Sequence, residues 1–145
     1  MLRDPIAKQY TGGVTTVSYE QRLAVYKKDC EAPFTEEQSE CAVTDKASGI
    51  YLGYCGFMPA QEIEGSEFFH GLCRDSWGKG YGYEAAAAAL THFFKNTKHD
   101  SFVATVVSQN TGSIKILQKL GFRKTGTISN SSQGNIECYE ITKPF

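Results

Sequence analysis

The run Trp77-Gly78-Lys79-Gly80-Tyr81-Gly82-Tyr83-Glu84-Ala85-Ala86-Ala87-Ala88-Ala89-Leu90 is the most informative part of this chain. Its three glycines let the backbone reach positive φ and approach a ligand without an intervening Cβ. The alanine-rich segment behind them predicts a helix, whose first turn offers unpaired N–H groups and a partial positive charge. The run therefore predicts a backbone cradle for an anion, most often a phosphate or pyrophosphate group.

The composition of the chain indicates one folded domain over residues 1–145. Hydrophobic residues make up 41% and aromatic residues 12%, which argues against disorder. The formal net charge of −1 gives no electrostatic case for binding nucleic acid. The longest apolar run is too short to span a bilayer, and the segment after Met1 has no signal-peptide core. We therefore expect a cytoplasmic protein with neither nucleic acid nor a membrane as partner.

The cysteine pattern points to reduced thiols. An odd number of cysteines without any C-x-x-C spacing fits free core thiols better than a disulfide framework. No close Cys/His pair has ligand spacing, so no metal site is expected. The cysteines are Cys30, Cys41, Cys55, Cys73 and Cys138.

Hydrophobic periodicity and turn residues predict a succession of helices and strands. A first helix is expected after Ser18, which forms a capping box with Gln21. A second is expected from about Tyr83 to Lys95, and a third from Asn110 to Leu120 with Gly121 as its stop. Strands are expected at Glu40–Thr44, Ile50–Phe57, Glu67–Cys73, Ser101–Val107, Arg123–Ser129 and Asn135–Thr142.

This order predicts an α/β (α+β) fold with a mixed, mostly antiparallel sheet and helices on both faces. The helix between Glu67–Cys73 and Ser101–Val107 forces a crossover, so these two strands are expected to be parallel. The other neighbouring strands are expected to pair as hairpins. A parallel junction leaves a crevice at the carboxyl ends of its strands, and the glycine turn lies at that junction.

Two motifs in this order resemble the GNAT superfamily of N-acetyltransferases, and within it the RimJ/RimL branch of ribosomal-protein N-terminal acetyltransferases. The first is the turn from Trp77 to Ala85; the second is the run Asn110-Thr111-Gly112-Ser113-Ile114-Lys115-Ile116-Leu117-Gln118-Lys119-Leu120-Gly121-Phe122. The resemblance covers roughly Glu67 to Phe122 and is weaker elsewhere. It implies an acyl-CoA N-acyltransferase fold, with the parallel pair splayed apart, and acetyl-CoA as cosubstrate.

The same resemblance implies where the coenzyme binds. The pyrophosphate is expected on the backbone N–H groups from Gly78 to Gly82, and the pantetheine between the splayed parallel strands, on the backbone of Leu72 and Cys73. Asn110 and Ser113 are expected to contact the coenzyme from the other side. A backbone N–H near the pantetheine would also polarise the thioester carbonyl. The implied coenzyme residues are Leu72, Cys73, Trp77, Gly78, Lys79, Gly80, Tyr81, Gly82, Asn110 and Ser113.

Three features depart from the family pattern. The first strand and first helix of the family are missing before Arg3-Asp4-Pro5. Leu117 stands where many members carry a tyrosine that protonates the leaving thiolate. Trp77 replaces a Gln or Arg that opens the turn in many relatives, as is usual in this branch.

Several of these residues also have purely structural interpretations. The three glycines fit a structural turn, and Trp77 fits packing beneath it. Glu84 complements the helix dipole, and Asn110 serves as an N-cap whether or not it also contacts a ligand.

The acceptor amine needs a path for its proton, and the candidate bases are Glu67, His70 and Tyr139. Glu67 begins the strand that leads to the thioester, where relatives often carry a glutamate. His70 lies on the opposite face of that strand, so one of the two is expected to face the acceptor. Tyr139 and Cys138 point to opposite faces of the last strand and are further neighbours of the acceptor. A water relay could replace a direct base.

Three functions remain open at the level of sequence. The first is an N-acetyltransferase in which a protein N-terminus, an amino acid, a polyamine or an aminoglycoside attacks the thioester directly. The second is a non-catalytic coenzyme A-binding or regulatory domain, and the third a phosphate-binding domain for another nucleotide. A bare edge at Glu40–Thr44 also predicts a homodimer.

Overall fold

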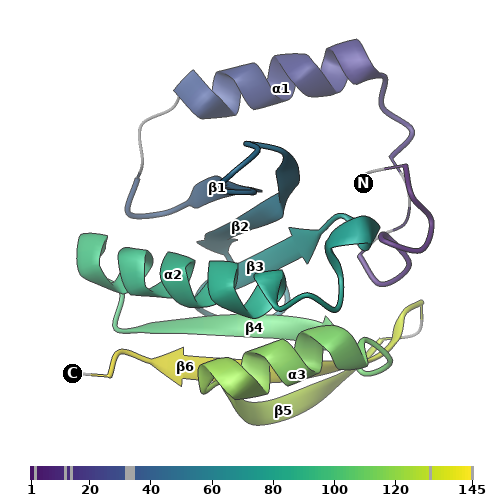
Figure 1. The fold of residues 1–145 in the computed structure, drawn as a ribbon. Coiled ribbons are helices and arrows are strands. Elements are labelled where there is room, and N and C mark those ends of the chain that lie inside the picture. Colours follow the sequence, from purple (N-terminus) through teal and green to yellow (C-terminus); the bar gives the residue numbers. More distant parts are fainter. Residues whose placement is uncertain (2, 12, 14, 32–34, 131, 145) are drawn as a thin grey trace.

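The computed structural model describes residues 1, 3–11, 13, 15–31, 35–130 and 132–144, apart from the side chains of residues 26, 29–31 and 130. Its elements follow in the order α1 (Tyr19–Glu31), β1 (Ser39–Thr44), β2 (Tyr51–Pro59), β3 (Ser66–Leu72), the 3₁₀ turn η1 (Arg74–Ser76), α2 (Tyr81–Asn96), β4 (Ser101–Val107), α3 (Thr111–Leu120), β5 (Arg123–Asn130) and β6 (Gly134–Thr142). Figure 1 shows α2 and α3 side by side against the sheet, while α1 lies over its β1–β2 end.

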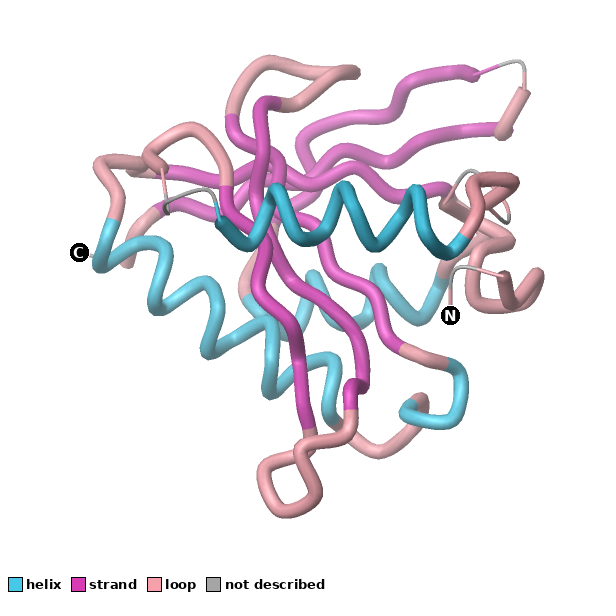
Figure 2. The backbone as a smooth tube through the Cα atoms, turned by 90° about the horizontal axis from the view of Figure 1, so that it is seen from above, coloured by secondary structure: helices cyan, strands magenta, loops and turns pink. Residues whose placement is uncertain are grey.

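The sheet has six strands in the order β1-β2-β3-β4-β6-β5. As expected, β3 and β4 are parallel, and β1–β2 and β2–β3 are antiparallel neighbours. The C-terminal half differs from a simple succession, because β6 lies between β4 and β5 and is antiparallel to both. The crossover through α3 carries β5 one position outward, and β6 occupies the place between β4 and β5. In Figure 2, the sheet separates α1 from α2 and α3.

The core lies between the sheet and α2. The fully buried rings of Phe57, Phe93 and Phe102 form its centre, with centroids of Phe57 and Phe93 4.8 Å apart. Helix α2 also approaches α3 closely at Gly82, where an added Cβ would lie 2.8 Å from Ile116 Cδ1. Gly82 is therefore a packing glycine, and the core holds α2 and α3 together beside the parallel strands.

Local signals fix the ends of the helices. Ser18 and Gln21 form the expected capping box, with reciprocal bonds of 3.1 and 3.2 Å between side chain and backbone. Gly121 ends α3 in the left-handed conformation, at φ 98°. Helix α2 begins at Tyr81, two residues before the expected start, because Gly80 is already its N-cap.

The cysteines are less uniformly buried than expected. Cys55 and Cys138 are buried and Cys73 is half-buried, but Cys41 is exposed on the edge strand β1; all four are free. The side chain of Cys30 lies outside the described residues. Within the described part of the chain, no helix is long and apolar enough to cross a membrane.

Candidate active site

The parallel strands β3 and β4 separate soon after they meet. A single pair, Glu67 opposite Val103, sets their register, whereas β2 and β3 pair along the whole of β3. Beyond that pair, towards the carboxyl ends of both strands, the two backbones diverge. The sheet therefore contains the splayed parallel pair that the family resemblance implies.

Backbone groups of β3 face this opening. The N–H of Cys73 donates to the Leu52 carbonyl at 2.7 Å and so extends the ladder to β2. Because bonded and non-bonded pairs alternate in an antiparallel ladder, Leu72 and His70 turn their N–H and C=O groups away from β2. The Cys73 N–H is thus already bonded within the sheet, and His70 and Leu72 supply the backbone groups that face the opening.

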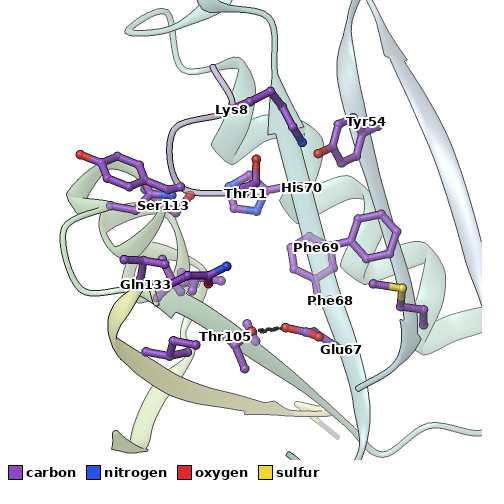
Figure 3. Close-up of a pocket in the computed structure, with 18 of the residues that line it drawn as sticks. Lys8, Thr11, Tyr54, Glu67, Phe68, Phe69, His70, Thr105, Ser113 and Gln133 are labelled. Carbon is purple, nitrogen blue, oxygen red and sulfur yellow. Dashed lines mark hydrogen bonds between the residues drawn. The ribbon is translucent and has the colours of Figure 1, made fainter. Parts of the chain in front are cut away.

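Glu67 fills the point where the strands separate. Its Oε1 accepts the backbone N–H of Thr105 at 3.2 Å and also accepts the Thr105 hydroxyl (Figure 3). The carboxylate thereby satisfies a β4 amide at the point where pairing with β3 has ended. Glu67 has a structural role here in addition to any role in proton transfer.

The glycine turn closes the far end of the opening. Gly78 and Gly80 have φ angles of 71° and 84°, values that side-chain-bearing residues rarely adopt. Gly80 is the N-cap of α2 and has no side chain to cap the first-turn N–H groups. Trp77 donates its Nε1–H to the Leu72 carbonyl at 3.0 Å, which ties the turn to the end of β3.

Helix α3 forms the opposite wall. Asn110 is its N-cap, as expected, and its side chain accepts the Ser113 N–H at 3.2 Å. Lys115 and Lys119 follow one helical turn apart, and the Lys119 ammonium lies 4.1 Å from the centre of the Tyr83 ring. The wall thus brings positive charge to the mouth of the opening.

A cavity of about 600 Å³ occupies the mouth between these walls. Seven of the ten predicted coenzyme residues line it: Leu72, Trp77, Gly78, Gly80, Gly82, Asn110 and Ser113. Cys73, Lys79 and Tyr81 are not among its lining residues. The glycine cradle, the α2 N-terminus and the two lysines suit a polyphosphate group, so the residues present fit coenzyme A.

A second cavity, of about 410 Å³, extends deeper into the sheet. Glu67 and His70 both line it, although they lie on opposite faces of β3, because the cavity runs through the splay. Leu117 lines it as well. The two cavities share Lys8, Tyr10, Thr11, Tyr54, His70, Asn110 and Ser113, so they meet.

The N-terminal segment forms a wall that the sequence did not predict. Residues 6–11 line the larger cavity, and the segment is held by an ion pair between Asp4 Oδ2 and Arg74 Nε at 3.3 Å. Lys8 and Tyr10 come from this segment and Tyr54 comes from β2. No local pattern marks these residues, since only the fold brings them to β3.

His70 is held in its neutral form. Burial lowers the pKa of its imidazole to about 4, and the ring stacks on Phe68 with centroids 5.9 Å apart. A group with so low a pKa accepts a proton only weakly near neutrality. Burial therefore weakens His70 as a candidate base, and Glu67 is the other candidate that lines the cavity.

Tyr139 lies in the core instead of the cavity. Its side chain is 2% exposed, and its hydroxyl donates to Glu137 Oε2 at 2.7 Å. Burial and that bond raise the pKa of the phenol to about 12. Tyr139 lines neither cavity. Burial, followed by the charges of Glu67 and Glu62, raises the pKa of the thiol of Cys138, on the other face of β6.

Comparison with known proteins identifies the family. The Acetyltransferase (GNAT) domain matches residues 1–123 of the chain. The chain belongs to this family. This GNAT domain is 36% identical over 87 residues to the uncharacterized protein YkkB of Bacillus subtilis (strain 168), a match covering 58% of the chain and 50% of YkkB. The chain spans about half the length of the curated relatives it matches.

Solved structures share the fold of this GNAT domain. A GNAT-family acetyltransferase from Bacillus anthracis superimposes with a TM-score of 0.79 at 24% identity, over 97% of the chain and 84% of that protein. Spermidine N-acetyltransferase from Vibrio cholerae, in complex with CoA and spermine, gives a TM-score of 0.79 at 16% identity, over 97% of the chain and 85% of that protein. At these identities the likeness concerns the fold alone.

Proposed function

We propose that residues 1–145 act as one domain that transfers an acetyl group from acetyl-CoA to a primary amine. The observation that carries the proposal is the splay of β3 from β4, with the glycine turn at its mouth and an acceptor cavity behind it. The pyrophosphate is assigned to the turn and the α2 N-terminus, and the pantetheine to the backbone groups of His70 and Leu72. The RimJ/RimL-like motifs and the family support the same reaction class.

The proposed reaction is a direct attack within a ternary complex. The amine nitrogen forms a bond to the thioester carbonyl carbon, the C–S bond breaks, and the proton leaves the nitrogen for Glu67, directly or through water. A backbone N–H of β3 stabilises the developing oxyanion. Leu117 has no proton to give, so the thiolate leaves unaided or takes its proton from water or another donor.

Coenzyme A is expected to stabilise the folded protein. At about 100 times its dissociation constant, a ligand that binds only the native state adds roughly 2.7 kcal/mol to the free energy of unfolding. Thermal melts with coenzyme A, ATP and NAD measure this, and a shift with coenzyme A alone is the expected result. Equal shifts with all three nucleotides would favour a general phosphate-binding domain, and no shift with millimolar coenzyme A would contradict the proposal.

Measuring acetyl transfer distinguishes an acetyltransferase from a domain that binds coenzyme A without catalysis. Release of free coenzyme A thiol from acetyl-CoA, measured with a panel of amines, is the direct assay. Coenzyme A binding without turnover of any amine would favour the non-catalytic, regulatory alternative.

The cytoplasm remains the expected compartment, because the described cysteines are free thiols.

We also propose a homodimer formed through the exposed edge strand β1. Among the described residues, the strand ends the sheet on that side and has β2 as its one paired neighbour, and most of its residues are exposed. An open edge offers N–H and C=O groups to a second chain. Light scattering is expected to give twice the chain mass of 16.0 kDa, and a monomer mass at high concentration would contradict the dimer.

A further inference from the structure

We propose that the acceptor is a small amine that carries an anionic group beside its amino nitrogen, as an α-amino acid does, and that Lys8 binds this group. The inference rests on the proposed acetyltransferase function and adds the substrate class. It starts from the charged side chains that line the smaller cavity.

Lys8 stands where the two cavities meet. It lines both of them, together with Tyr54 and His70. In the view of Figure 3, its amino nitrogen points toward the Tyr54 hydroxyl, at the opposite end of the cavity from Glu67. An anion held by Lys8 therefore lies at the junction, near the place where the thioester enters the acceptor cavity.

The surroundings of Lys8 favour an anionic partner. The residue is half-buried, and burial, followed by the charge of Arg22, lowers the pKa of its amino group. The ion pairs recorded among the described residues join Arg74 to Asp4 and Lys124 to Glu137, and neither involves Lys8. A partly desolvated cation next to a second cation gains free energy when an anion binds.

The charges of the cavity argue against a polyamine. Its lining carries two cations, Lys8 and Arg22, and two carboxylates, Glu40 and Glu67, while His70 is neutral. A polyamine is cationic along its whole length and calls for an excess of carboxylates. A zwitterion matches a lining in which positive and negative groups balance.

Adjacent amino and anionic groups fit the geometry. In an α-amino acid, two bonds separate the amino nitrogen from the carboxylate carbon. When Lys8 binds the carboxylate, the amine therefore also lies at the junction of the two cavities. The remainder of the molecule then runs along the cavity wall formed by Met58 and Phe69 toward Glu67. The amine thus lies at the junction, near the thioester, and its proton reaches Glu67 through water in the cavity.

The test compares amino acids with their own amides. Each pair differs only by the anionic group, so wild-type kcat/KM is expected to be about 10- to 100-fold higher for the acid, the effect of one charged hydrogen bond. Because the amide lowers the pKa of its own amine, rates are compared per concentration of unprotonated amine. Spermidine and spermine complete the panel, and a preference for them or for the amides would overturn the inference.

Substitutions of Lys8 test whether this residue causes the preference for amino acids over their amides. Lys8→Met is expected to remove the acid-over-amide preference, and Lys8→Arg is expected to restore part of it. Lys95→Met, on the exposed end of α2, is the matched control and should keep the wild-type preference. An undiminished preference in folded Lys8→Met would refute the role of Lys8.

A binding measurement keeps this result separate from the proposed function. Calorimetry of the acids and amides on coenzyme A-saturated protein reports acceptor binding without chemistry. If no amine turns over but the acids bind more tightly than the amides, the acetyltransferase proposal fails and the recognition of an anionic amine stands. If neither class binds and neither turns over, both fail.

Discussion

Gly80→Val is expected to weaken coenzyme A binding about 100-fold or more while the domain stays folded. Gly80 has a φ of 84° as the N-cap of α2, a conformation that a β-branched residue adopts only with strain. Relief of that strain rotates the peptide and redirects the first-turn N–H groups, each of which donates a charge-assisted bond worth about 1.5–3 kcal/mol. Calorimetry with coenzyme A measures the affinity, and circular dichroism checks the fold.

Gly49→Val is the matched control for this substitution. Gly49 also has a positive φ, at 71°, and an added Cβ at either glycine meets no atom within 4 Å. It lies in the turn between β1 and β2 and lines neither cavity. Both variants should lose similar stability, but only Gly80→Val should lose coenzyme A. A folded Gly80→Val that binds as tightly as wild type would show that the pyrophosphate lies elsewhere.

Glu67→Gln is expected to lower kcat by about 10²–10⁴-fold, the usual cost of losing a general base. Glutamine retains an oxygen that can accept the Thr105 N–H and hydroxyl, so the strand junction should survive while the basic group is lost. Coenzyme A affinity should change little. Rates at saturating acetyl-CoA and acceptor provide the measurement.

The competing account makes Glu67 only a structural link between β3 and β4. Under that account, Glu67→Gln retains its kcat, and water carries the proton. Glu20→Gln, on an exposed position of α1, controls for the loss of one carboxylate. His70 would then be the remaining candidate in the cavity, although its low pKa makes it a weak acceptor.

Much of the fold followed from local sequence patterns. The glycine turn, the Ser18 capping box, the Asn110 N-cap and the Gly121 stop each act within a few residues, so sequence reasoning located them well. The parallel pairing of β3 and β4 followed from the chirality and length of the connection. The position of β6 between β4 and β5 did not follow from local patterns, because the order of strands in a sheet depends on tertiary pairing.

The candidate site was only partly predictable. Alternation along a strand showed that Cys138 and Tyr139 face opposite ways, but the face that meets the cavity depends on the whole sheet, and Tyr139 turned into the core. Lys8 and Tyr54 were missed, since they are distant in sequence from the motifs and lie in segments without a functional pattern. Lys115 and Lys119 had a usable signal, because two lysines four residues apart share one face of a helix.

A crystal structure of the protein with coenzyme A is the most direct test of the central proposal, that the β3–β4 opening is the coenzyme site. The predicted result places the pyrophosphate on the backbone from Gly78 to Gly82, the pantetheine along His70 and Leu72, and the sulfur facing the smaller cavity. Coenzyme A bound at full occupancy outside this opening, with β3 and β4 unengaged, would contradict it.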